Sequence, residues 1–189
     1  MAKIALLLAP GFADWEYGLI AGTGRPFFGL DVRFFDPAPG TPVSQGGLAA
    51  SIPQGFDDLR SWQPDVAAVA GGTIWESSEA PDLRGLLAGL HARGAAMAGI
   101  CGGTLALARA GLLGQARHTS NHPSFLTDNA TGYDGASRYC ESANAVSDRR
   151  VITAPGTAPA SLAAAASAAA GLAEATVAQF RSMMAAEHA

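Results

Sequence analysis

The 189-residue chain is 49% hydrophobic and only 15% charged, with a formal net charge of −4. This composition excludes a disordered chain and is typical of one globular domain with a sizeable core. The acidic balance, without a basic cluster, argues against a nucleic-acid partner, and no apolar run is long enough to cross a membrane. The N-terminal apolar run is also too short for a signal peptide, so we expect a cytoplasmic protein without a membrane partner.

The two cysteines and four histidines are scattered along the chain. Their spacing indicates neither a disulfide framework nor a metal site, so we expect no metal ion and no other cofactor. Cys140 lies in a polar segment without a supporting motif, and we interpret it as structural or incidental.

The first predicted strand is Lys3 to Leu8, an apolar run that ends before Pro10-Gly11. Such a run is typical of a strand buried on both faces of a parallel sheet. A helix is predicted from Asp14 to Ala21, starting at the carboxyl edge of that strand. Glu16 therefore lies in the first helical turn, where it either faces the ligand crevice or only stabilises the helix dipole.

Two further strands are predicted before residue 73, separated by a loop or short hairpin rich in Pro and Gly and then by a short helix. In chain order these segments are Leu30–Phe35, Pro37–Gly47, Gln54–Leu59 and Pro64–Gly72. The last strand ends in Gly71 and Gly72, which form either a simple tight turn or a pair of backbone donors for an oxyanion. Trp75 and Glu76 follow, and we expect them to line the same crevice.

A single cysteine stands between a predicted strand and a predicted helix in the segment Ala98-Gly-Ile-Cys-Gly-Gly-Thr104. The strand, 95–100, follows an amphipathic helix predicted over 81–93, and the next helix spans 104–110. A sharp strand-to-helix turn needs small neighbours and holds the central side chain clear of the strand edge. The helix amides then favour a thiolate at Cys101, although a lone cysteine is otherwise often a small buried hydrophobe.

Two histidines follow this elbow, in the segment Arg117–Pro123. One of them, His118 or His122, is a candidate partner for Cys101, although a histidine near a turn is otherwise a common surface residue. The remaining segments predict a peripheral loop or short antiparallel strands, a strand with a turn inside it, and an alanine-rich helical stretch interrupted at Gly171. Their ranges are 128–142, 146–154 and 159–186.

Strands and helices alternate from one end of the chain to the other. This alternation predicts a single α/β domain over residues 1–189, with a doubly wound, flavodoxin-like and mostly parallel sheet that has helices on both faces. The ligand crevice is expected at the carboxyl ends of the strands, where the elbow cysteine lies.

Several segments together resemble the ThiJ/PfpI family of the class I glutamine amidotransferase-like superfamily, along nearly the whole chain. They are Pro10–Glu16, Val69–Gly72, Ala98–Ala108 with Ala110–Leu113, and Val151–Thr157. The resemblance implies that Cys101 is the nucleophile, that Glu16 is a protonated carboxyl which hydrogen-bonds its sulfur, and that Gly71 and Gly72 donate amides to the pocket. The other candidates for the oxyanion or substrate-binding part of the site are Gly102, Trp75 and Asn121.

The chain departs from the family pattern at the histidine. Many members carry Thr-Thr-His after the elbow helix, whereas this chain reads Thr119-Ser120-Asn121 with His118 and His122 beside that position. The usual Cys-His pair is therefore absent, rebuilt from a shifted histidine, or supplied by another arrangement.

The resemblance implies a cysteine-dependent hydrolase or lyase acting on a small-molecule substrate such as an amide, a peptide, an isocyanide or a reactive aldehyde. The alternative is an oxidative-stress sensor that works through oxidation of Cys101 without turnover. A third hypothesis is a non-chemical binding module. Relatives are commonly dimeric, so the resemblance also implies a homodimer, with Phe27-Phe28 or the loop after Pro37 as candidate contact surfaces.

Overall fold

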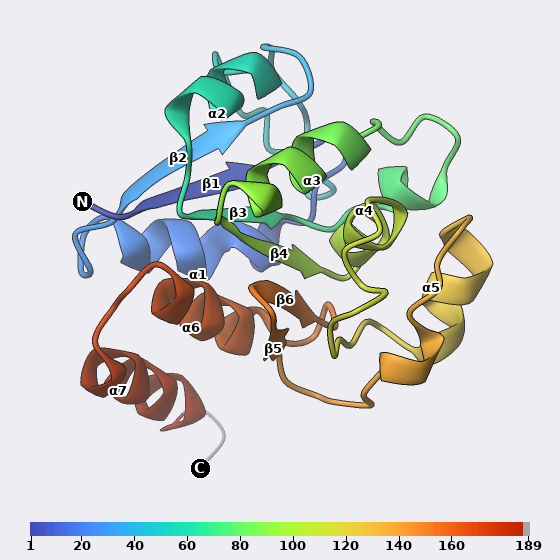
Figure 1. Ribbon diagram of the computed structural model, residues 1–189. Helices are drawn as coiled ribbons and strands as arrows, with labels where there is room; N and C mark the ends of the chain where they lie inside the picture. The colour runs from blue at the N-terminus through green and yellow to red at the C-terminus, as the bar shows by residue number, and fades with distance from the viewer. Residues whose placement is uncertain (187–189) are drawn as a thin grey trace.

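A computed structural model describes residues 1–186 as one six-stranded sheet with helices on both faces (Figure 1). The strand order is β2-β1-β3-β4-β6-β5, and all neighbours pair in parallel except β5 and β6. The strands are β1 (Lys3–Leu7), β2 (Asp31–Phe35), β3 (Val66–Val69), β4 (Ala96–Ile100), β5 (Val146–Asp148) and β6 (Val151–Ala154). The predicted doubly wound α/β fold is confirmed.

The helices form two layers, one on each face of the sheet (Figure 1). One layer holds α1 (Asp14–Gly24), α6 (Pro159–Ala169) and α7 (Glu174–Ala185), and the other holds α2 (Phe56–Trp62), α3 (Arg84–Ala92) and α4 (Gly103–Arg109). Helix α5 (Pro123–Asn129) and the short 3-10 turns η1 (Thr73–Glu76) and η2 (Ala136–Arg138) complete the described chain. No helix among residues 1–186 has the length and apolar character required to span a bilayer.

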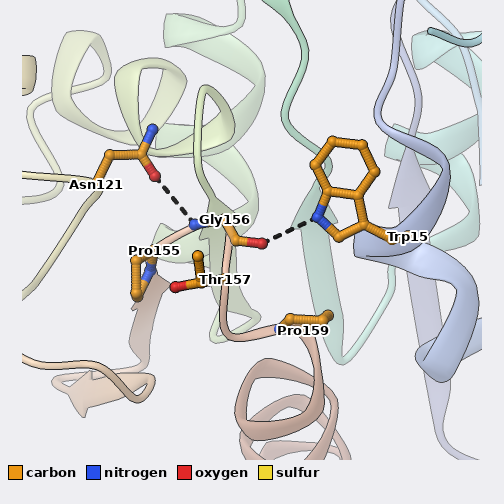
Figure 2. A pocket seen from close by; sticks show the side chains of 6 residues that line it. All are labelled: Trp15, Asn121, Pro155, Gly156, Thr157 and Pro159. Carbon is orange, nitrogen blue, oxygen red and sulfur yellow. Dashed lines mark hydrogen bonds between the residues drawn. The ribbon is translucent and has the colours of Figure 1, made fainter.

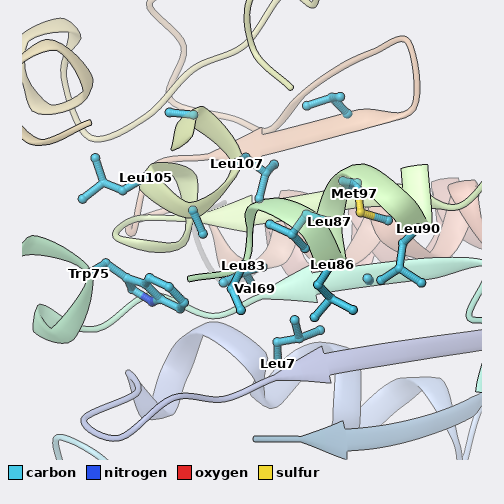
Figure 3. Close-up of a cluster of buried hydrophobic side chains, with 14 of the residues drawn as sticks. Leu7, Val69, Trp75, Leu83, Leu86, Leu87, Leu90, Met97, Leu105 and Leu107 are labelled. Atoms are coloured by element: carbon cyan, nitrogen blue, oxygen red, sulfur yellow. The ribbon is translucent and has the colours of Figure 1, made fainter. Parts of the chain in front are cut away.

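Strand β1 shows how the sequence builds two cores at once. Its side chains alternate, so Ala5 and Leu7 pack with the α2–α3–α4 layer while Ile4 and Leu6 pack with the α1–α6–α7 layer. Figure 3 shows the first of these clusters, with Leu7 facing the leucines of α3. Burial on both faces explains why the central strands are continuous apolar runs.

The strand order shows where in the fold a ligand site is expected. The chain runs from β1 outward to β2 and then returns past β1 to β3, so the direction of winding changes between β1 and β3. Ligand sites of open α/β sheets lie at such a switch point, outside the carboxyl ends of the strands. The loops that follow β1, β3, β4 and β6 all leave from this edge.

Three local features of the structure differ from what the sequence predicts. Helix α3 begins at Arg84 rather than Pro81, because the Asp82 carboxylate accepts the Arg84 N–H at 3.0 Å and starts the helix there. Helix α5 was not predicted, although its first residue, Pro123, is a typical helix-start signal. The predicted strand over 146–154 is a hairpin of β5 and β6, with the predicted turn at its centre.

This hairpin turn generates a prediction about stability. Arg149 and Arg150 have φ angles of 50° and 60°, in the left-handed region that costs a non-glycine residue roughly 1 kcal/mol. An Asn-Gly pair suits a two-residue turn of this kind. We expect the double substitution Arg149→Asn and Arg150→Gly to raise the free energy of unfolding by about 1 kcal/mol in urea denaturation.

Arg60→Gly, on the exposed side of α2, is the control, and it should lower the free energy of unfolding by about 1 kcal/mol. Equal loss of stability in both variants would contradict the assignment of strain to the β5–β6 turn.

Candidate active site

Cys101 stands at the turn between β4 and α4 with a backbone φ of 52°. Few side chains adopt this left-handed geometry, and it is held here by close packing around the turn. A Cβ atom on Gly102 would lie 2.7 Å from the carbonyl oxygen of Gly72, and one on Gly99 would lie 2.9 Å from that of Gly103. The predicted elbow is therefore present, and its glycines are required by close approach of backbone segments.

Glu16 lies in the first turn of α1 and is only 1% exposed. Its Oε2 accepts the N–H of Gly71 at 2.5 Å, which ties the start of α1 to the loop after β3. Its Oε1 is buried and receives no N–H or O–H from any residue in the range 1–186. The group beside this oxygen is the Cys101 thiol: a Cβ on Gly156 would lie 3.2 Å from Cys101 Sγ and 3.3 Å from Glu16 Oε1.

Burial raises the pKa of Glu16 from 4.5 to about 7, against the opposing effects of the Gly71 amide and the Cys101 thiol. Burial also raises the pKa of the Cys101 thiol, and the Glu16 carboxylate raises it further, whereas hydrogen bonds from Asn121 and Gly102 lower it. Burial therefore outweighs the amides of the seven-residue α4 and acts against the predicted low-pKa thiolate at Cys101. A negative charge on Glu16 also opposes ionisation of the thiol, so the two groups do not titrate independently.

Asn121 occupies the position where the family places its histidine, and its side chain faces the sulfur. Its Nδ2 donates to Cys101 Sγ at 3.3 Å, and its Oδ1 accepts the N–H of Gly156 at 3.0 Å. The preceding residues are fixed in turn, because Ser120 Oγ hydrogen-bonds Thr104 Oγ1 at 2.7 Å and the Thr119 N–H donates to Thr153 Oγ1 at 2.8 Å. The sequence left three arrangements open, and the structure shows the last of them, another arrangement, in which the Asn121 side-chain amide contacts the sulfur.

Neither predicted histidine reaches the sulfur. His118 is fully buried, with Nδ1 bonded to the Ala116 carbonyl oxygen at 2.8 Å and Nε2 to the Tyr133 hydroxyl at 2.6 Å, and burial lowers its pKa. His122 is exposed and bonds Ser124 Oγ through Nδ1 at 2.9 Å. Both histidines are engaged elsewhere, so the structure corrects the prediction that one of them pairs with Cys101.

The structure places the predicted oxyanion and substrate residues in different environments, and not all of them face the sulfur. The Gly71 amide is occupied by Glu16, so it is not free for an oxyanion. Trp75 is 1% exposed and bonds the Ala70 carbonyl oxygen, which makes it a core residue beneath the elbow rather than a crevice wall. Glu76 is exposed. A hydrogen bond from the Gly102 amide lowers the pKa of Cys101, so this amide faces the sulfur. A Cβ on Gly102 would lie 2.7 Å from the Gly72 carbonyl oxygen and 3.2 Å from the Gly72 nitrogen, so Gly72 is the neighbour of Gly102.

An open pocket of about 720 Å³ is lined by Asn121 and Gly156, which both lie against the Cys101 sulfur, and two of the residues that shape the pocket have no predicted role in the site (Figure 2). Trp15 Nε1 donates to the Gly156 carbonyl oxygen at 3.0 Å, while the Gly156 N–H is held by Asn121. Trp15 and Gly156 both lie in segments that carry the family resemblance, Pro10–Glu16 and Val151–Thr157, but the sequence pattern assigns neither of them a role in the site. The available signal was a large aromatic residue directly before Glu16, at the carboxyl edge of the sheet.

Comparison with known proteins identifies relatives of this chain and of its fold. A model described as the DJ-1/PfpI family matches residues 2–177. A Bacillus subtilis protein named uncharacterized protease YoaZ is 33% identical over 165 residues, covering 83% of this chain and 78% of its own. Among solved structures, the DJ-1 superfamily protein Atu0886 from Agrobacterium tumefaciens has a TM-score of 0.92 and 33% identity, with both chains fully covered. A thiJ/pfpI family protein from Bacillus anthracis has a TM-score of 0.75 and 25% identity, covering 91% of this chain and 84% of its own.

The raised pKa of Glu16 predicts a pH-dependent stability. The folded protein holds this proton up to about pH 7, whereas an ordinary glutamate carboxyl group loses it near pH 4.5. The protonated native state is favoured at low pH, so the contribution of Glu16 is lost as pH rises from 4.5 to 7. We expect the wild type to lose about 3 kcal/mol relative to Glu16→Gln over this range, measured by urea denaturation at several pH values. Parallel curves for the two proteins would show that folding does not change the pKa of Glu16.

The contact between Asn121 Nδ2 and Cys101 Sγ predicts how substitutions at residue 121 change the reactivity of the thiol. Asn121→His introduces an imidazole beside the sulfur, and we expect alkylation of Cys101 by iodoacetamide near neutral pH to rise about tenfold. Asn121→Ala removes a donor that lowers the Cys101 pKa, so its alkylation should slow several-fold. Mass spectrometry resolves Cys101 from Cys140, which serves as the internal control. Equal rates at Cys101 in all three proteins would rule out a contact between residue 121 and the reacting sulfur.

Proposed function

The chain belongs to the DJ-1/PfpI family, and from this premise we propose that it is an enzyme in which Cys101 attacks an electrophilic carbon of a small substrate. The observation that carries the proposal is the buried Glu16 carboxyl beside the Cys101 thiol, with one carboxyl oxygen that receives no N–H or O–H from residues 1–186. A carboxyl group with a pKa of about 7 is poised to take and return a proton near neutral pH.

The first step needs no other base. The pKa of about 7 leaves part of Glu16 ionised near neutral pH, and in this form it takes the Cys101 proton while the sulfur forms a bond to the substrate carbon and the carbonyl electron pair moves to oxygen. The amide of Gly102, beside the sulfur, and the amide of the neighbouring Gly72 are the donors we assign to that oxyanion. Return of the proton from Glu16 to this oxygen gives a neutral covalent adduct, so one carboxyl group balances the addition.

No histidine among residues 1–186 hydrogen-bonds the sulfur, and this favours some substrates over others. Hydrolysis of an amide through a thioester needs a group that first protonates the departing amine and then activates water, and Asn121 provides neither function, so both would fall to the buried Glu16. Addition to a reactive aldehyde needs only the single proton that Glu16 carries back and forth. We therefore favour a small reactive aldehyde over an amide or a peptide, and treat peptide hydrolysis, suggested by the name of the Bacillus subtilis relative, as the second candidate.

The same geometry supports an alternative role as a sensor of oxidation. Cys101 is partly exposed, and peroxide converts a cysteine first to a sulfenic acid and then to a sulfinic acid. Glu16 Oε1 receives no N–H or O–H from residues 1–186, so a protonated Oε1 is free to donate to an oxidised sulfur. The homodimer expected from the resemblance stays a prediction.

The two roles are separated by a substrate panel combined with mild oxidation. We expect wild-type protein to turn over at least one small aldehyde, Cys101→Ala to be inactive, and Glu16→Gln to lose about 100-fold or more in kcat because the proton acceptor is gone. Cys140→Ala is the matched control and should keep full activity.

Selective oxidation of Cys101 by dilute peroxide, without turnover of any aldehyde, amide or peptide, would contradict the proposed enzyme and support the role as a sensor of oxidation. A Cys101 that neither turns over substrate nor reacts with peroxide would exclude both roles.

A further inference from the structure

The pocket near Cys101 is organised around one residue, Gly156. Asn121 accepts the Gly156 N–H and Trp15 donates to the Gly156 carbonyl oxygen, so the peptide groups on both sides of this residue are held (Figure 2). The lining consists of six residues from three separate segments: Trp15, Asn121, Pro155, Gly156, Thr157 and Pro159. Cys101 itself is not part of this lining, but Asn121 and Gly156 both lie against its sulfur, so the pocket adjoins the reacting atom across these two residues.

Trp15 is placed unusually for so large an apolar side chain. It lies in the first turn of α1, next to the fully buried Glu16, yet 53% of its surface is exposed. Its single polar atom is already used by Gly156, so the exposed part of the side chain is the apolar ring. Pro159 extends this apolar surface beneath Trp15, whereas Pro155 lies on the other side of Gly156, below Asn121 (Figure 2).

The side chains that line the pocket offer no positive charge to an anionic ligand. None of the six lining residues is ionisable, so a carboxylate or phosphate would meet no side-chain countercharge there. The ionisable residues on either side of Trp15 in the sequence are both acidic. Hydrogen bonds from Ser44 and Gly46 lower the pKa of Asp14, which keeps it negative, and Glu16 carries a growing negative charge as pH passes 7.

We propose that Trp15 is a specificity-determining residue of this site and that it selects uncharged substrates whose planar, apolar group stacks on its indole ring. This inference rests on the proposed function, because it takes Cys101 as the reacting atom. It defines the substrate further: an electrophilic carbon at the sulfur, a neutral planar substituent in the pocket, and no carboxylate or phosphate. Amino-acid and phosphorylated substrates are disfavoured, because no lining side chain provides a countercharge.

The test measures recognition by the rate at which Cys101 is alkylated, and it does not depend on turnover. Three matched reagents are compared on the full chain: iodoacetamide, N-phenyliodoacetamide and iodoacetate. Each rate at Cys101, read by mass spectrometry, is divided by the rate of the same reagent with the neutral thiol N-acetylcysteine amide. This division removes the intrinsic reactivity of each reagent.

Stacking on Trp15 should make the normalised rate of N-phenyliodoacetamide about 3- to 10-fold higher than that of iodoacetamide, on the scale of an aromatic pair. Iodoacetate should be slower than iodoacetamide by a similar factor. Trp15→Leu should abolish the phenyl preference, whereas Trp15→Phe, which keeps a ring but loses the bond to Gly156, should keep most of it. Phe27→Leu replaces an aromatic side chain that is 77% exposed outside the pocket, and it should change nothing.

Two results would overturn the inference. A phenyl preference that survives Trp15→Leu would remove Trp15 from recognition, and a normalised rate for iodoacetate equal to or above that of iodoacetamide would refute the selection for neutral ligands. Loss of the preference in both Trp15→Leu and Trp15→Phe would show that Trp15 only fixes the Gly156 peptide. Failure of the proposed function is a separate result, because it appears as absent turnover with the alkylation preference intact.

Discussion

The structure depends on one buried carboxyl group placed beside one thiol. Glu16 is taken out of water at the start of α1, bound to the Gly71 amide through one oxygen, and left with its other oxygen beside Cys101. Desolvation, with no positively charged partner among residues 1–186, is what moves its pKa to about 7. Four loops at this edge of the sheet serve the pair: β1–α1 brings Glu16, β3–η1 brings Gly71, the β4–α4 elbow brings Cys101, and β6–α6 covers both with Gly156.

The fold was predictable because it follows from patterns of burial. Apolar runs such as Lys3–Leu7, bounded by Pro and Gly, indicate buried parallel strands, and the glycine-flanked cysteine indicates a strand-to-helix turn. The structure also brings together Cys101, Glu16 and Asn121, three of the predicted site candidates, while their chemical roles stay predictions. These features depend on neighbouring residues or belong to a recognised motif, so they can be predicted from the sequence alone.

The rest of the site depends on contacts between distant segments. The sequence does not show that His118 is enclosed by Tyr133 and Tyr139, that Trp75 turns inward to Ala70, or that Trp15 reaches across to Gly156. The direction of the Cys101 pKa shift was missed for a related reason. A helix N-terminus is visible in the sequence, whereas the desolvation that outweighs it is a property of the assembled crevice.

The central claim is that Glu16 is a neutral carboxylic acid below about pH 7 and gives up its proton near that pH. Infrared difference spectroscopy during a pH titration tests this claim most directly, with Glu16→Gln as the reference and Cys140→Ala as the background. The account predicts a carboxylic acid carbonyl band that is absent from the Glu16→Gln variant and disappears with a midpoint near pH 7. A band that is already lost near pH 4.5 would contradict it, because Glu16 would then be an ordinary ionised carboxylate.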